Sequence, residues 1–221
     1  MCRLAMINQE GIKYIVENYG LQKLFDYLER QLGGHGNGYC FVYKNGDYCV
    51  TKGVSLSNED IVNDILKEYD NIRWVIYHTR LASVGNINNN NCHPFECDGK
   101  VLAMNGTERN YTVVKKGLTD TENILLSSDN LLKDTKKYHS VFLGYEDGKV
   151  FATKNSGSLQ YMDCANGGKI FASNFPLQYY YREDIYEAPQ FFVEGNKINK
   201  QKLAKAYNRY TEYYSYILGA E

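Results

Sequence analysis

The second residue of the chain, Cys2, can act as a nucleophile that carries its own base. A cysteine reacts as the thiolate, so its thiol needs a group that accepts the proton. If Met1 is removed, Cys2 gains a free α-amine, whose ordinary pKa of about 7.7–8.0 suits a general base near neutral pH. Methionine before a small residue such as Cys2 is normally trimmed, and we expect Met1 to leave. The structural alternative is that Cys2 is a small buried residue at the start of a strand.

Polar residues follow two apolar segments, each of which is expected to be a strand. Residues 74–77 lead to Arg80, whose planar guanidinium can bind a carboxylate through two hydrogen bonds. Residues 100–104 lead to Asn105 and Gly106, whose side-chain amide and backbone N–H can donate to one oxygen, as an oxyanion hole requires. Taken alone, Arg80 could equally form a surface ion pair, and Asn105 and Gly106 an ordinary turn.

Asp120 lies in the first turn of a helix that the spacing of Thr119 and Glu122 predicts. Its carboxylate could bind a substrate ammonium, or it could simply complement the helix dipole. Residues 92–97 contain two cysteines and a histidine, but their spacing is not that of a zinc finger and no second ligand pair follows. We therefore expect no metal.

The elements that must position these residues alternate between helices and pairs of strands. Hydrophobic periodicity predicts a strand over 2–7 and two helices between 9 and 32, separated at Gly20. Turn residues predict hairpins centred on Asn45-Gly46 and on residues 146–148. The other predicted elements are a flexible loop over 33–38, helices over 57–69 and 119–131, strands over 158–162 and 170–173, and a terminal amphipathic helix from Asn199. Helices between groups of hairpins favour two helix-covered sheets over a doubly wound parallel sheet.

Five segments, in this order, resemble the class II glutamine amidotransferase domain, which belongs to the N-terminal-nucleophile hydrolases. They are Cys2, His78-Thr79-Arg80-Leu81-Ala82, Asn91-Cys92-His93-Pro94-Phe95, Met104-Asn105-Gly106 and Thr119-Asp120-Thr121-Glu122. The resemblance spans roughly residues 2–175. It implies an α+β fold, a four-layer αββα sandwich of two mostly antiparallel sheets.

The resemblance also implies a reaction. Cys2 would attack the side-chain amide of glutamine with its own α-amine as base, form a γ-glutamyl thioester and release ammonia. Asn105 and the N–H of Gly106 would stabilise the tetrahedral oxyanion. No cofactor is implied.

Substrate binding is implied for residues at the end of the strand predicted over 74–77 and for one residue at the start of the helix predicted over 119–131. Arg80 would bind the α-carboxylate of glutamine, Asp120 (or Asp129 in its place) would bind the α-ammonium, and the segment after Arg80 would act as a lid. The neighbours of Arg80 that the resemblance also places at the substrate are His78, Thr79 and Leu81. Leu81 stands where the sugar-phosphate synthases of the family have tryptophan, which leaves lid closure and subfamily open.

Composition argues against several other classes of protein. The formal net charge of −1 over 221 residues gives no general attraction to nucleic acid or to an anionic membrane. No apolar run has the length of a signal peptide or of a membrane span, so we expect a cytoplasmic protein whose six cysteines are reduced.

We expect a single domain over 1–221, in which 176–221 is a Tyr-rich C-terminal extension ending in a helix. Three functions are compatible with the sequence. The chain is a glutaminase that supplies ammonia to a separate synthetase subunit, a stand-alone amidase that cleaves γ-glutamyl bonds in a small molecule, or a non-catalytic binding protein that retains the fold. The tyrosines of the extension could bind such a partner subunit or pack on their own domain.

Overall fold

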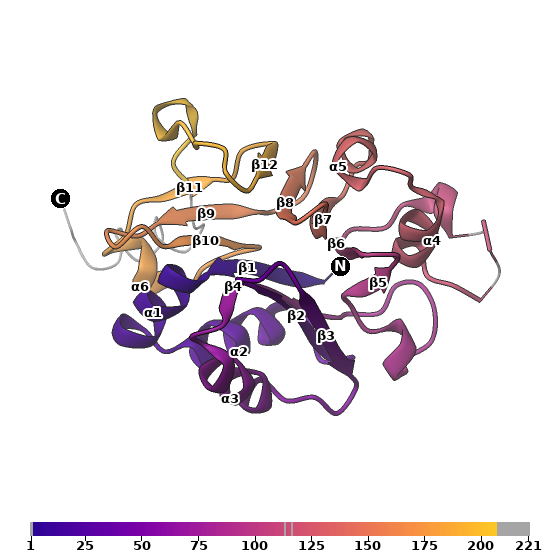
Figure 1. Ribbon diagram of the computed structural model, residues 1–221, viewed down its shortest axis with the longest axis horizontal. Coiled ribbons are helices and arrows are strands. Elements are labelled where there is room, and N and C mark those ends of the chain that lie inside the picture. Colours follow the sequence, from indigo (N-terminus) through magenta and orange to yellow (C-terminus); the bar gives the residue numbers. More distant parts are fainter. Residues whose placement is uncertain (1, 113, 116, 207–221) are drawn as a thin grey trace, which may run out of the picture.

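Two antiparallel sheets face each other in the computed structural model, which describes residues 2–112, 114–115 and 117–206 (Figure 1). The seven-stranded sheet has the order β11 (Ile185–Glu187), β9 (Gln160–Asp163), β10 (Lys169–Ala172), β1 (Arg3–Asn8), β4 (Ile72–Thr79), β2 (Asn37–Tyr43) and β3 (Tyr48–Gly53). The five-stranded sheet has the order β12 (Phe191–Val193), β8 (Lys149–Lys154), β7 (Val141–Glu146), β6 (Lys100–Asn105) and β5 (Phe95–Cys97).

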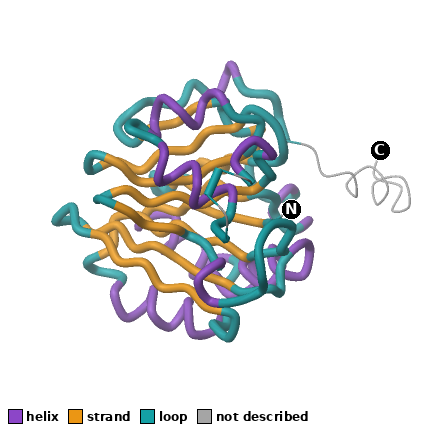
Figure 2. The backbone as a smooth tube through the Cα atoms, turned by 90° about the vertical axis from the view of Figure 1, so that its right-hand side faces the viewer, coloured by secondary structure: helices purple, strands orange, loops and turns teal. Residues whose placement is uncertain are grey.

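Three hydrophobic cores separate four layers of secondary structure. The first lies between the seven-stranded sheet and the helices α1 (Gln9–Asn18), α2 (Leu21–Leu32) and α3 (Asn58–Glu68). The second lies between the two sheets, and the third lies between the five-stranded sheet and the helices α4 (Asp120–Ser127) and α5 (Leu131–Asp134). Figure 2 shows the strands between these two helical layers. The predicted α+β fold, an αββα sandwich, is confirmed.

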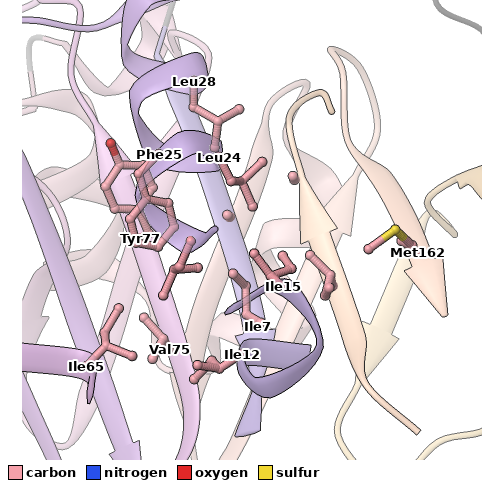
Figure 3. Close-up of a cluster of buried hydrophobic side chains, with 14 of the residues drawn as sticks. Ile7, Ile12, Ile15, Leu24, Phe25, Leu28, Ile65, Val75, Tyr77 and Met162 are labelled. Atoms are coloured by element: carbon pink, nitrogen blue, oxygen red, sulfur yellow. The ribbon is translucent and has the colours of Figure 1, made fainter. Parts of the chain in front are cut away.

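The helices under the seven-stranded sheet form where the periodicity places them. Figure 3 shows side chains of α2 packed over the strand residue Tyr77, whose ring stacks on Phe25 with 4.0 Å between centroids. Gly20 separates α1 from α2 with a φ of +89°, a conformation that glycine adopts without a steric penalty. Ser57 and Asp60 form a reciprocal capping box that starts α3.

The single helix predicted over 119–131 is in fact two helices. Ser128 after α4 has an extended backbone, and the side chain of Asn130 caps α5 by accepting from Lys133 N–H. The buried carboxylate of Glu146 accepts hydrogen bonds from the backbone N–H groups of Leu131 and Leu132. A continuous helix would use these N–H groups internally, so a contact that is distant in sequence ends α4 and starts α5.

The segment after residue 176 takes part in both sheets. After the short helix α6 (Leu177–Tyr180), β11 pairs with β9 and β12 pairs with β8. Tyr179 is fully buried, and its ring stacks on Tyr19 of the same chain with 3.9 Å between centroids. From Asn199 to residue 206 the chain forms one 3₁₀ turn and a β-bridge instead of the predicted helix. The rest of that predicted helix, 207–221, lies outside the described residues. None of the helices described is both long and apolar enough to cross a bilayer.

Candidate active site

The N-terminus of β1 and the C-terminal ends of β4 and β6 meet at one end of the sandwich (Figure 1). Because β1 runs antiparallel to β4 with Arg3 opposite Thr79, Cys2 lies next to Arg80. In the facing sheet β6 ends at Asn105, whose Oδ1 accepts a hydrogen bond of 2.9 Å from the backbone N of Cys2. The fold therefore joins two residues that are 103 positions apart in the chain.

The orientation of Asn105 suits an oxyanion hole. Its Oδ1 is occupied by the backbone N of Cys2, so the two N–H donors of Nδ2 remain for another acceptor. The next residue, Gly106, lines the same pocket as Cys2 and has a φ of +151°. Asn105 thus contacts the backbone of Cys2 without lining the pocket itself, and Gly106 lines the pocket, so both residues expected to form the oxyanion hole lie next to Cys2.

Gly106 also has no room for a side chain. A Cβ at this position would lie 2.2 Å from Ser140 Oγ and 2.6 Å from Ser140 Cβ. We expect Gly106→Ala to lower the free energy of unfolding by about 2–5 kcal/mol, measured by urea denaturation, because backbone strain and overpacking add. Gly99→Ala is the matched control, since Gly99 also has positive φ (+77°) but a Cβ there would meet nothing within 4 Å. Equal losses in the two variants would contradict the steric argument.

The thiol of Cys2 is buried, and burial raises its pKa above the ordinary value. The backbone N–H of Leu81, 3.4 Å from Sγ, and the positive charge of Arg80 act in the opposite direction without cancelling this effect. The resting thiol is therefore protonated at neutral pH. It needs a base close by to become a nucleophile, and the α-amine of a processed Cys2 would be attached to the same residue.

Arg80 lines the pocket and is almost completely buried. Its Nη1 donates to Asn86 O at 2.9 Å, and its Nη2 donates to Val84 O at 2.7 Å. Three of its five N–H donors remain, enough for a bidentate contact with a carboxylate. The guanidinium thus holds the segment that follows it in sequence and could bind a substrate as well.

Asp120, rather than Asp129, lies at the pocket. It is the first residue of α4, its Oδ2 accepts from the backbone N of Glu108 at 2.9 Å, and burial raises the pKa of its carboxyl. Asp129 is exposed in the connection between α4 and α5 and does not line the pocket. An ammonium placed between Asp120 and the thiol would relieve the cost of burying this carboxylate.

The pocket is small in this conformation. Its volume of about 20 Å³ holds roughly one water molecule, far less than a glutamine side chain. Three of its lining residues, Leu81, Ser83 and Val84, belong to the segment after Arg80, and Ser83 Oγ lies 3.1 Å from Thr107 Oγ1. A glutamine side chain fits only if this lining rearranges, and the segment after Arg80, which the sequence predicts to act as a lid, is part of it.

His78 and Thr79, predicted to bind substrate, do not line the pocket. His78 is fully buried between the sheets, stacks on His93 with 4.2 Å between centroids and contacts Met104 O through Nε2 at 3.1 Å. Burial lowers the pKa of His78 to about 3 and that of His93 well below its ordinary value, so both rings are neutral. His93 Nδ1 accepts from Met104 N–H, and the pair therefore supports the backbone immediately before Asn105.

Thr79 is separated from the pocket by the alternation of side chains along β4. Its side chain is fully buried on the face covered by α2, where a Cβ on Gly33 would lie 2.2 Å from Thr79 Oγ1. Leu81, by contrast, reaches the pocket, and its backbone contacts the thiol. In the described part of the chain no group of three or more His, Cys, Asp or Glu side chains could hold a metal ion.

Two solved structures have a similar fold, and each aligns with 90% of the residues of this chain. One is described as the allosteric regulatory enzyme of purine biosynthesis, with 19% sequence identity and a TM-score of 0.55. The other is glutamine phosphoribosylpyrophosphate amidotransferase from B. subtilis, in complex with ADP and GMP, with 15% identity and a TM-score of 0.50. This chain therefore shares its fold with these two enzymes.

The likeness to these two enzymes concerns the fold, because sequence identity is below 20% in both cases. The chain spans about half the length of each of these two enzymes. No protein-family profile and no curated sequence matches it. The similarity predicted from the five sequence segments is thus confirmed at the level of three-dimensional structure.

Some residues at the site carry no recognisable sequence signal. The carbonyls of Val84 and Asn86 contact Arg80 through the backbone, which any residue type supplies. His35 contacts Ala82 from the loop over 33–38, which its glycines predict to be flexible. In the structure this loop is hydrogen-bonded to the backbone of Arg80, and Gly38 already belongs to β2. The only feature of the sequence that could have indicated a role for His35 is its position as a histidine among glycines.

Proposed function

We propose that this protein is a class II glutamine amidotransferase that hydrolyses the side-chain amide of glutamine with Cys2 as its nucleophile. The observation that carries the proposal is the 2.9 Å contact between Cys2 N and Asn105 Oδ1. It supports the proposal because it brings the backbone N of Cys2, next to the thiol, to the amide side chain of Asn105. An N-terminal-nucleophile mechanism needs these three groups together.

In the first half of the reaction the α-amine of Cys2 takes the thiol proton. The thiolate attacks the side-chain carbonyl carbon of glutamine, and the carbonyl oxygen gains a negative charge that Asn105 Nδ2 and Gly106 N–H stabilise. When the tetrahedral intermediate collapses, the α-ammonium returns its proton to the departing nitrogen. Ammonia leaves, and a γ-glutamyl thioester remains on Cys2.

In the second half a water molecule attacks the thioester and gives up its proton to the same α-amine. The thiol is regenerated and glutamate leaves. Arg80 would hold the α-carboxylate and Asp120 the α-ammonium throughout, so that the substrate is oriented by its two charged groups. Both side chains line the pocket that contains Cys2, which supports these roles.

The ammonia is proposed to pass to a separate acceptor enzyme. The described residues build the sandwich, and those after 176 supply the strands β11 and β12 instead of a second catalytic unit. An amidase that cleaves γ-glutamyl bonds in a small molecule would use the same chemistry. The two are distinguished by comparing free glutamine with a γ-glutamyl anilide, and the first proposal predicts faster turnover of glutamine.

The proposal is tested by incubating the protein with a glutamine analogue that carries an alkylating group in place of the amide, followed by intact-mass measurement. We expect a protein that lacks Met1 and gains one equivalent of the analogue on Cys2. Excess glutamine should prevent the labelling. A protein that retains Met1, or is labelled equally on other cysteines, would argue for the non-catalytic alternative.

Substitution of Asp120 tests how the substrate ammonium is recognised. We expect Asp120→Asn to raise KM for glutamine about 10- to 100-fold, because a buried charge-assisted hydrogen bond is lost. Asp129→Asn is the matched control and should leave KM unchanged, since Asp129 is exposed and outside the pocket. Steady-state ammonia release measures both, and the reverse pattern would transfer the role to Asp129.

A further inference from the structure

The loop between α2 and β2 pairs with the chain just after β4. His35 N donates to Arg80 O at 2.9 Å, and Arg80 N donates to Gly36 O at 2.8 Å. These bonds continue the β2–β4 ladder by one step beyond its last strand pair, Asn37 with Thr79. The backbone of Arg80 is therefore fixed from both its N–H and its carbonyl group.

Glycines on both sides of His35 fix the path of this loop. Gly34 and Gly36 have φ values of +91° and +120°, which favour glycine. A Cβ on Gly36 would lie 2.4 Å from Cys92 Sγ and 3.1 Å from Gly53 O. The loop is thus packed closely against its surroundings, and His35 is presented from a defined backbone conformation.

The side chain of His35 makes a contact that the ladder does not require. Its Nδ1 accepts a hydrogen bond of 2.9 Å from the backbone N of Ala82. An imidazole nitrogen accepts a hydrogen bond through its lone pair, so this contact assigns the acceptor role to Nδ1 and leaves Nε2 as the N–H position. His35 Nδ1 therefore fixes the N–H of Ala82, near the start of the segment after Arg80.

Between the two fixed residues lies Leu81, the one that touches the nucleophile. Its N–H lies 3.4 Å from Cys2 Sγ, and its carbonyl oxygen accepts from the same sulfur at 3.6 Å. A hydrogen bond from an N–H group to sulfur favours the thiolate over the thiol. The Leu81 N–H belongs to the Arg80–Leu81 peptide, whose carbonyl oxygen accepts from His35 N, and the next peptide is held at Ala82 N–H by His35 Nδ1. Because both peptides are anchored, Leu81 has little freedom to rotate away from the sulfur.

We propose that His35 is a positioning residue for the nucleophile, whose Nδ1 keeps the Leu81 N–H directed at Cys2 Sγ. This inference rests on the proposed role of Cys2. His35 does not line the pocket, and it acts by holding the Leu81–Ala82 peptide, which directly follows the peptide that carries the Leu81 N–H. A histidine that served only to fill the loop would not need an acceptor at this atom.

The experiment compares His35→Asn with His35→Leu in the full-length protein. The Oδ1 of asparagine takes the place of Nδ1 as acceptor, whereas leucine fills similar space without one. The rate of Cys2 alkylation by iodoacetamide, read from the N-terminal peptide, reports thiolate formation without requiring turnover. Alkylation of the exposed Cys49 in the same sample serves as the internal control.

We expect His35→Leu to lower the rate of Cys2 alkylation and kcat about 10-fold, with KM within about twofold, and His35→Asn to restore both to near the wild-type values. Alkylation of His35→Leu at the wild-type rate, or no recovery in His35→Asn, would overturn the proposal. If the leucine variant does not fold, His35→Gln replaces it. The acceptor Oε1 of glutamine lies one carbon further from the backbone than Nδ1 of histidine, so Cys2 in this variant should also be alkylated slowly. A wild-type protein that releases no ammonia would refute the proposed function, while the alkylation rates would still decide the role of His35.

Discussion

Cys2→Ala is expected to abolish the release of ammonia from glutamine, with a loss in kcat on the order of 10⁴-fold or more. No other described cysteine lines the pocket, so nothing replaces the lost nucleophile among the residues that the structure describes. The oxyanion donors would remain, but without a covalent intermediate they act only on the slow attack of water. The measurement is steady-state ammonia release, with glutamate formation followed in parallel.

The matched control is Cys49→Ala, the same substitution at an exposed cysteine of β3 that lies outside the pocket. It should keep wild-type turnover. Ammonia release that persists in Cys2→Ala at the wild-type rate would refute the mechanism. A protein with an uncleaved residue before Cys2 should be as inactive as Cys2→Ala, because its α-amine has become an amide that cannot accept the proton.

Asn105→Asp is expected to lower kcat about 10²- to 10³-fold, the effect of losing one oxyanion-hole donor. Aspartate has the shape of asparagine and keeps an oxygen for the 2.9 Å contact with Cys2 N, so the nucleophile stays in place. It lacks the N–H groups of Nδ2, and its negative charge opposes the oxyanion. KM should change much less than kcat, because the donor acts mainly in the transition state.

Asn45→Asp provides the comparison for this variant. Asn45 lies in the exposed turn between β2 and β3, and the substitution introduces the same charge away from Cys2. Thermal unfolding of both variants separates a loss of fold from a loss of transition-state stabilisation. If Asn105→Asp lost affinity for glutamine at unchanged kcat, Asn105 would be a substrate-binding residue and the oxyanion hole would have to be elsewhere.

The secondary structure follows closely from local patterns. The strand pairs around Asn45-Gly46 and residues 146–148, and the break between α1 and α2 at Gly20, depend on turn geometry that a few adjacent residues determine. The helix predicted over 119–131 begins at Asp120 as expected but ends early, at Ser127, and the separate helix that follows is capped by Glu146, which is distant in sequence. The helix predicted from Asn199 was wrong as far as residue 206, where Lys205 forms a bridge with Tyr186.

The candidate site was only partly predictable for the same reason. Arg80, Asp120 and the pair Asn105-Gly106 could be found because each follows a strand or opens a helix. Thr79 was expected beside the substrate, yet the alternation of side chains along β4 turns it toward α2. The choice between Asp120 and Asp129 depended on which end of α4 faces the sulfur, and periodicity carries no information on this.

The sequence by itself determined the residue types of the site, because a thiol, an amide, a guanidinium and a carboxylate are covalent properties of Cys2, Asn105, Arg80 and Asp120. Tertiary structure decided which of their atoms meet. The contact of Cys2 N with Asn105 Oδ1 exists because two sheets pack face to face and both residues lie at the same end. The contacts of Leu81 with the sulfur, and of His35 with Ala82, are made through backbone groups that every residue possesses, so only the fold could reveal them.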